Sequence, residues 1–187
     1  MILKDIIFLY GKEGQALDIS LRSCTETEYD LFFQGYVSDP LMVSQKYVYN
    51  REVVARSYEY NYHQRENYAN FGIFLDNHPV GLFQLKRINS EQKKCEFGIV
   101  LQNDSVKNRG IGTAAVSLGI EIARKQFGIE TLIGDTNETN ARMRHVFEKL
   151  GFQLSQVVPA AMRKTEIDPT DDLLIYELKL TKKEDLP

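Results

Sequence analysis

The most informative segment of this chain is Lys107-Asn-Arg-Gly-Ile-Gly-Thr113. It directly follows an apolar run at 95–101 that is typical of a strand, and it opens a stretch with helical periodicity. Gly110 and Gly112 allow a sharp turn and let a ligand approach the backbone closely. Unpaired N–H groups at a helix start favour phosphate oxygens, and Arg109 can add positive charge. The stretch therefore predicts a strand-to-helix turn that can receive a phosphate group.

The spacing of this stretch does not fit two common nucleotide-binding motifs. A dinucleotide-binding turn needs a third glycine, but Ala115 and Val116 follow in the places where it would stand. A P-loop needs Gly-Lys followed by Ser or Thr, which does not occur here. A Gly-x-Gly pair alone fits a tight turn without a ligand equally well, so the assignment depends on the surrounding sequence.

Periodicity outward from the turn predicts a mixed α/β fold. Ile111, Ala115, Leu118 and Ile122 share one helical face, so we expect a helix over about 110–126. Capping signals and periodicity predict further helices over 25–35, from Asp39-Pro40 onward, over 51–65 and over 143–150. Short apolar runs between turn residues predict strands at 2–10, 16–23, 71–76, 80–88, 95–101, 130–135, 152–158 and 173–180.

The predicted order is an antiparallel meander followed by strand, helix, strand, helix, strand and strand. The strand-helix-strand unit around 95–135 implies that its two strands are parallel neighbours in the sheet. A chain of 187 residues, with 43% hydrophobic and 26% charged residues, fits one globular domain over 1–187.

Composition narrows the classes of partner and location. The net charge of −3, without a cluster of Lys and Arg, argues against nucleic acid as a partner. The apolar run at 2–10 is too short to span a bilayer and lacks the features of a signal peptide, so we expect a cytoplasmic protein without a membrane partner. Cys24 and Cys95 have no metal-ligand spacing, so we expect reduced thiols and no metal.

Three coordinated matches across 95–152 resemble the GNAT superfamily of N-acetyltransferases. Lys107 to Gly112 is similar to its signature of Gln or Arg, two residues, Gly, one residue, and Gly or Ala, with Lys107 in the first place. Asn140 followed by Glu148-Lys-Leu-Gly-Phe152 resembles the family's next helix and its exit. Glu96-Phe-Gly-Ile99 resembles a run in the ribosomal-protein N-acetyltransferase branch.

This resemblance implies a cofactor, acetyl-CoA, that acts as co-substrate, bound between two diverging strands. It assigns the pyrophosphate to the N–H groups of 108–113 and the pantetheine arm to the backbone of 99–101. Asn140 would bind the same arm, although a helix-capping role explains this residue as well. The implied cofactor-binding residues are Ile99, Val100, Leu101, Lys107, Asn108, Arg109, Gly110, Ile111, Gly112, Thr113 and Asn140.

The implied reaction moves an acetyl group directly to a primary amine, on a protein N-terminus or a small molecule. An amine with a pKa of about 10 must first lose a proton, and Glu96 is the expected general base. The alternative for Glu96 is an exposed carboxylate paired with Lys93 or Lys94. Phe147 stands where many family members carry a Tyr general acid, which leaves a non-catalytic acyl-CoA-binding module as the alternative function.

The acceptor and the oligomeric state stay open at this point. Six of the ten tyrosines lie between Tyr47 and Tyr68. They fit either an acceptor pocket or the packing of an amphipathic helix. A homodimer is compatible with the sequence.

Overall fold

The computed structural model describes residues 6–12, 15–39, 46–163 and 171–180. Within these residues, eight strands form one mixed sheet in the order β1-β2-β3-β4-β5-β6-β8-β7. The strands are β1 Ile6–Lys12, β2 Gln15–Arg22, β3 Ala69–Leu75, β4 His78–Asn89, β5 Lys94–Leu101, β6 Thr131–Asn137, β7 Gln153–Val158 and β8 Leu173–Lys179. The α-helices are α1 Glu26–Gln34, α2 Arg51–Glu59, α3 Ile111–Phe127 and α4 Ala141–Lys149.

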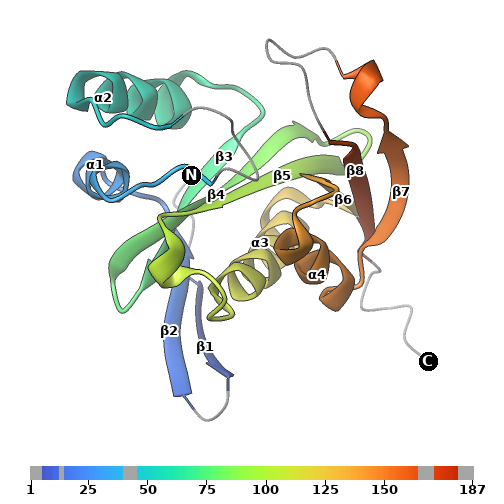
Figure 1. The fold of residues 1–187 in the computed structure, drawn as a ribbon, viewed down its shortest axis with the longest axis horizontal. Helices are drawn as coiled ribbons and strands as arrows, with labels where there is room; N and C mark the ends of the chain where they lie inside the picture. Colours follow the sequence, from blue (N-terminus) through green and yellow to red (C-terminus); the bar gives the residue numbers. More distant parts are fainter. Residues whose placement is uncertain (1–5, 13–14, 40–45, 164–170, 181–187) are drawn as a thin grey trace.

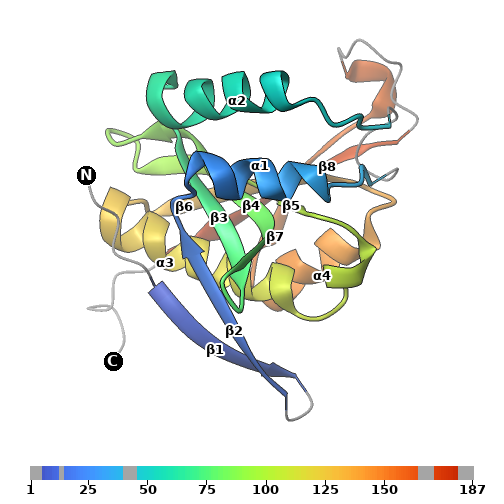
Figure 2. The same cartoon turned by 90° about the vertical axis from the view of Figure 1, so that its left-hand side faces the viewer.

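The predicted element order is confirmed. Strands β1 to β5 form an antiparallel meander, and α3 connects β5 to its parallel neighbour β6. Helices α1 and α2 cover one face of the sheet, while α3 and α4 cover the other (Figures 1 and 2). No helix among the described residues is long and apolar enough to cross a membrane.

Five consecutive residues of β3, Phe71 to Leu75, are buried, so both faces of this strand are covered, which fits a sheet between two layers of helices. The larger core lies under α3, where Ile111, Ala115, Leu118 and Ile122 are buried as the periodicity predicts. Gly119 lets α3 approach β4, because a Cβ at this position would clash with the ring of Phe83. A smaller cluster of Cys24, Tyr29, Val54 and Phe74 fills the space under α1 and α2.

Several predicted boundaries are wrong. The helix expected over 51–65 ends as an α-helix at Glu59 and continues as a π-helical turn, Tyr60–Gln64. β1 extends to Lys12, two residues beyond the predicted end of this strand at residue 10. β4 begins at His78 and not at residue 80. The turn before it contains only Asp76 and Asn77, both with positive φ, and this turn type matches the twist of a hairpin. The helix start expected at Asp39-Pro40 lies largely outside the described residues.

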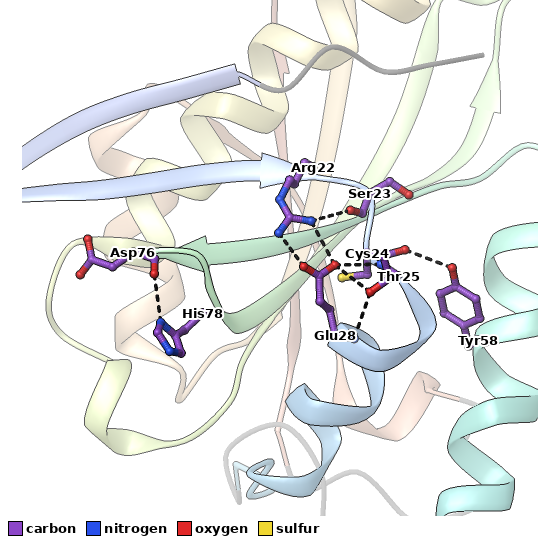
Figure 3. A network of polar contacts seen from close by, with 8 residues as sticks. All are labelled: Arg22, Ser23, Cys24, Thr25, Glu28, Tyr58, Asp76 and His78. Carbon is purple, nitrogen blue, oxygen red and sulfur yellow. Dashed lines mark hydrogen bonds and ion pairs between the residues drawn. The ribbon is translucent and has the colours of Figure 1, made fainter.

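The start of α1 follows the capping box that the spacing of Thr25 and Glu28 predicts (Figure 3). The sequence did not indicate a second partner of Glu28, which is Arg22 at the end of β2. The two side chains form hydrogen bonds of 2.6 and 3.0 Å. Hydrogen bonds from Arg22, with further ones from Thr25, lower the pKa of Glu28 to about 2. This ion pair therefore ties α1 to the sheet.

We expect Glu28→Gln to lower the free energy of unfolding at pH 7 by on the order of 2–3 kcal/mol. Because the folded state depresses the pKa of Glu28, its contribution is present above the unfolded pKa of about 4.5 and is lost as the pH falls toward 2. Urea unfolding of both proteins across this window measures the difference. A stability difference that persists unchanged at pH 2 would contradict this origin.

Candidate active site

The central strands β5 and β6 part from one another at the candidate site. They pair at Lys94, Cys95 and Glu96 of β5, with Thr131, Leu132 and Ile133 of β6. Beyond Glu96, β5 continues to Leu101 and β6 to Asn137 without pairing to each other. Ile99, Val100 and Leu101 lie in this diverging part, as expected. Backbone groups on the open side of β5 can therefore receive an extended ligand as an added strand.

The turn into α3 lies at the end of β5. Asn108 and Gly110 have φ values of 58° and 82°, so the chain passes twice through the left-handed region. Gly110 is the N-cap of α3 and contributes no capping side chain. The N–H groups of the first turn, at 111–113, are therefore available to an anion.

Gly112 is a glycine that the fold itself does not require. Its backbone is helical, and a Cβ at this position would meet only Leu101 Cδ1, at 3.9 Å. Glycine inside a helix costs about 0.5–1 kcal/mol relative to alanine. A position that needs neither positive φ nor close packing is best explained by a ligand that approaches the backbone.

Lys107 in this turn and Arg142 in α4 have acidic partners that the sequence did not indicate. Lys107 Nζ lies 2.8 Å from Asp39 Oδ2 and 2.9 Å from Asp104 Oδ1. Arg142 in α4 binds the same Asp39 oxygen at 2.6 Å. Burial lowers the pKa of Lys107, but the two carboxylates outweigh it and keep the pKa above its usual value. Arg109 is exposed to solvent.

Asn140, at the start of α4, and Phe147, within α4, are both buried. The Asn140 side chain caps α4 by accepting a hydrogen bond from Met143 N at 3.2 Å. This is the helix-capping role that the sequence allowed as the alternative to ligand binding. Phe147 is fully buried and stacks on Tyr176 with ring centroids 4.4 Å apart. Its ring also packs against Gly134 of β6. Phe147 therefore belongs to the core and brings no proton donor to the site.

Glu96 has an unexpected partner. Arg87 Nη1 lies 2.6 and 2.5 Å from the two carboxylate oxygens, and these bonds raise the pKa of Arg87. The pairing of Glu96 with Lys93 or Lys94 is wrong, because these lysines bind Glu130 and Glu177. Arg87 reaches Glu96 because a bulge in β4 gives it a φ of 51° and breaks the side-chain alternation.

A cavity of about 260 Å³ lies beneath α1 and the π-helical turn. Residues of these two elements and of strands β3, β4 and β5 line it. Tyr62, from the predicted tyrosine-rich region, lines it, whereas Tyr58 stacks on Tyr62 with ring centroids 4.7 Å apart. Most other lining residues were not predicted from the sequence, because they come from separate elements. The cavity is lined by Tyr29, Asn61, Tyr62, Asn70, Phe71, Leu82, Phe83, Gln84, Gly98, Ile99 and Val100.

Among the described residues, no group of three or more His, Cys, Asp or Glu side chains could hold a metal ion. Cys24 and Cys95 are both buried free thiols.

Comparisons with known proteins agree with this geometry. The model of the acetyltransferase (GNAT) domain matches residues 18–153, which is well over half of the chain. The comparison with curated protein sequences gives no match.

Solved structures share the fold at low sequence identity. A spermidine N-acetyltransferase SpeG chimera from Vibrio cholerae and hSSAT has a TM-score of 0.74 at 14% identity, over 86% of this chain and 95% of that one. The microcin self-immunity acetyltransferase MccE, in complex with acetyl-CoA and AMP, has a TM-score of 0.72 at 16% identity, over 87% and 92%. The ribosomal-protein acetyltransferase RimL, in complex with coenzyme A, has a TM-score of 0.70 at 18% identity, over 87% and 94%. With its diverging central strands and this domain match, the chain belongs to the GNAT acetyltransferase family.

Proposed function

We propose that this protein transfers an acetyl group from acetyl-CoA directly to a primary amine. The observation that carries the proposal is the divergence of β5 and β6 in front of Gly112, whose missing side chain leaves the start of α3 open. A strand-like ligand with a phosphate at one end matches both features. The CoA complexes of similar folds support the same assignment.

The residues of this chain fit such a ligand in three places. The N–H groups of 108–113 would hold the pyrophosphate, and Arg109 and Lys107 would add positive charge. The backbone of Ile99 to Leu101 would hold the pantetheine arm, with Asn140 beside it at the start of α4. When bound, acetyl-CoA supplies the activated acetyl thioester.

The chain must also handle protons. The incoming amine is an ammonium ion at neutral pH and must lose a proton before its nitrogen can attack. Glu96 is our proposed general base, acting through water, because it stands where β5 and β6 begin to part. Two hydrogen bonds from Arg87 hold its carboxylate in place. Phe147 offers no proton, and a thiol with an ordinary pKa of about 8.5 can be expelled without one.

We expect Glu96→Gln to lower kcat/KM for the amine by about a hundredfold at neutral pH. Acetyl-CoA affinity should stay unchanged, because Glu96 lies in the paired part of β5 rather than in the diverging part. Stopped-flow or steady-state thiol release gives the rate, and calorimetry gives the affinity. Full activity of the variant would exclude Glu96 as the general base.

The proposed function is tested by calorimetric titration of the purified protein with acetyl-CoA, with NADH and ATP as controls. Selective micromolar binding, followed by amine-dependent thiol release, is the expected result. No binding of any CoA ester would overturn the proposal. Binding without thiol release across a broad amine panel would favour a non-catalytic acyl-CoA-binding module, to which the buried Phe147 points.

We also propose that the chain forms one domain and that it acts in the cytoplasm. The continuous core under α3 supports a single folding unit. Two buried free thiols, Cys24 and Cys95, are typical of a reducing compartment. Fractionation of cells that express the protein tests the location.

A further inference from the structure

We propose that Asp39 is a positioning residue for acetyl-CoA, because its carboxylate ties the turn into α3 to the end of α1 and to α4. The inference rests on the proposed function, which places the pyrophosphate at this turn. Asp39 belongs to a different segment from the residues that would hold the donor. It would act on the donor through Lys107, in the turn, and Arg142, in the first turn of α4.

One oxygen of Asp39 holds two cations from distant parts of the chain. Asp39 Oδ2 lies 2.8 Å from Lys107 Nζ and 2.6 Å from Arg142 Nη2. The Asp39 and Lys107 side chains are only 18% and 12% exposed, so solvent ions screen their attraction less than that of an open surface pair. The carboxylate therefore sets how the turn into α3 lies relative to α4.

This pairing fixes the ammonium group of Lys107 and leaves it one donor. An ammonium group carries three N–H donors, and Asp39 and Asp104 lie 2.8 and 2.9 Å from Lys107 Nζ. No other acceptor among the described residues pairs with this nitrogen. The remaining N–H can serve a phosphate oxygen. Without Asp39, the flexible lysine stem would keep only the exposed Asp104 and would no longer hold the ammonium group in one place.

The segment that carries Asp39 is itself attached to the connection between β5 and α3. The backbone oxygen of Gln102 accepts a hydrogen bond from Val37 N at 2.8 Å. Asn103 Nδ2 donates to the backbone oxygen of Gly35 at 3.2 Å. A Cβ at Gly35 would lie only 2.7 Å from Gln102 Nε2, so the two segments are in close contact. Asp39 therefore extends from a supported backbone, as a positioning role requires.

The alternative role for Asp39 is to offset positive charge. The cluster contains two cations, Lys107 and Arg142, and two carboxylates, Asp39 and Asp104. If charge balance were the whole role, removing the carboxylate of Asp39 would leave extra positive charge near the donor phosphates and strengthen binding. If Asp39 positions the turn, the same change weakens binding. The two roles therefore predict effects of opposite sign.

Asp39→Asn is the first test, with acetyl-CoA as the titrant in calorimetry. We expect the dissociation constant of acetyl-CoA to rise about tenfold, as for the loss of one hydrogen bond between charged groups. Thermal unfolding of the same sample shows whether the variant is folded. Unchanged or tighter binding in a folded Asp39→Asn protein would overturn the inference.

Asp104→Asn is the matched control for Asp39→Asn. It removes the same charge from the same lysine, but Asp104 is 88% exposed and lies three residues before Lys107, so it joins no separate segment to the turn. Exposed ion pairs contribute little, so we expect affinity for acetyl-CoA to fall by about twofold or less. A loss as large as that of Asp39→Asn would show that charge alone matters and would overturn the positioning role.

A Lys107→Gln background shows whether Asp39 acts through the lysine. In that background, Asp39→Asn should weaken acetyl-CoA binding by about threefold or less, because its main partner is already gone. Asp39→Glu keeps the carboxylate, so its affinity should stay within about threefold of the wild type. An equal loss from Asp39→Asn in both backgrounds would mean general support of the fold and would overturn the positioning role.

Arg142→Gln is the second variant, in case Asp39→Asn does not fold. It removes the tie to α4, and the Arg142 side chain is partly exposed, so we expect a folded protein with about threefold weaker acetyl-CoA binding. Wild-type affinity in this variant would overturn the inference. The wild-type titration separates the two proposals, because absent donor binding there counts against the proposed function. Donor binding that is insensitive to Asp39→Asn counts against this inference alone.

Discussion

Replacing Gly112 with leucine is expected to weaken acetyl-CoA binding by about a thousandfold while the protein remains folded. The new side chain would occupy the open space in front of Leu101 and block access to the first turn of α3. Losing two charge-assisted hydrogen bonds to a phosphate costs about 3–4 kcal/mol, which corresponds to this factor. Calorimetric titration measures the affinity, and thermal unfolding confirms that the variant is folded.

Gly128 provides a matched control for Gly112. Both glycines have open space around them, but Gly128 ends α3 with a φ of 63°, whereas Gly112 is helical. Gly112→Ala should raise the free energy of unfolding by about 0.5–1 kcal/mol and still impair binding. Gly128→Ala should lower that free energy by about 1 kcal/mol and leave binding intact. Wild-type affinity in Gly112→Leu would show that no ligand approaches this backbone.

Replacing Phe147 with alanine is expected to lower the free energy of unfolding by about 3–5 kcal/mol. The ring is fully buried and stacks on Tyr176, and it also contacts Phe97 and Phe152 at centroid distances of 5.8 and 5.2 Å. Removing it leaves a cavity between α4 and the sheet that rigid neighbours can only partly fill. Urea unfolding at pH 7 measures the change.

Tyr60 serves as the comparison for Phe147. Its side chain is about half exposed, at 52%, so Tyr60→Ala should change stability by about 0.5 kcal/mol or less. If Phe147→Ala were as stable as Tyr60→Ala, the site could relax around the loss, and Phe147 would not be a main contributor to the core.

Features that depend on neighbours in the chain could be predicted from the sequence. The turn into α3 needs glycine at Gly110, where φ is 82°, and the buried face of α3 follows from the 3.6-residue period. The capping box of Thr25 and Glu28 is likewise a contact between residues three apart. These local rules, together with the motifs that resemble the family, were sufficient to indicate the fold, the diverging strands and the acetyl donor.

Features that join distant segments needed the tertiary structure. The bulge in β4 that turns Arg87 onto Glu96 has no local signal, because it arises from the register of β4 against β5. Asp39 meets Lys107 and Arg142 from segments 68 and 103 residues away.

The cavity beneath α1 depends on the same kind of long-range placement. It combines Tyr29 of α1, Asn61 of the π-helical turn, Asn70 of β3, Gln84 of β4 and Gly98 of β5. Short-range spacing sets the backbone of each element, whereas side-chain partners across the sheet depend on strand register and on how α1 packs over it. Local spacing and the motifs that resemble the family therefore indicated the turn into α3 and the candidate donor-binding residues, whereas strand register and the packing of α1 decide which side chains line the cavity.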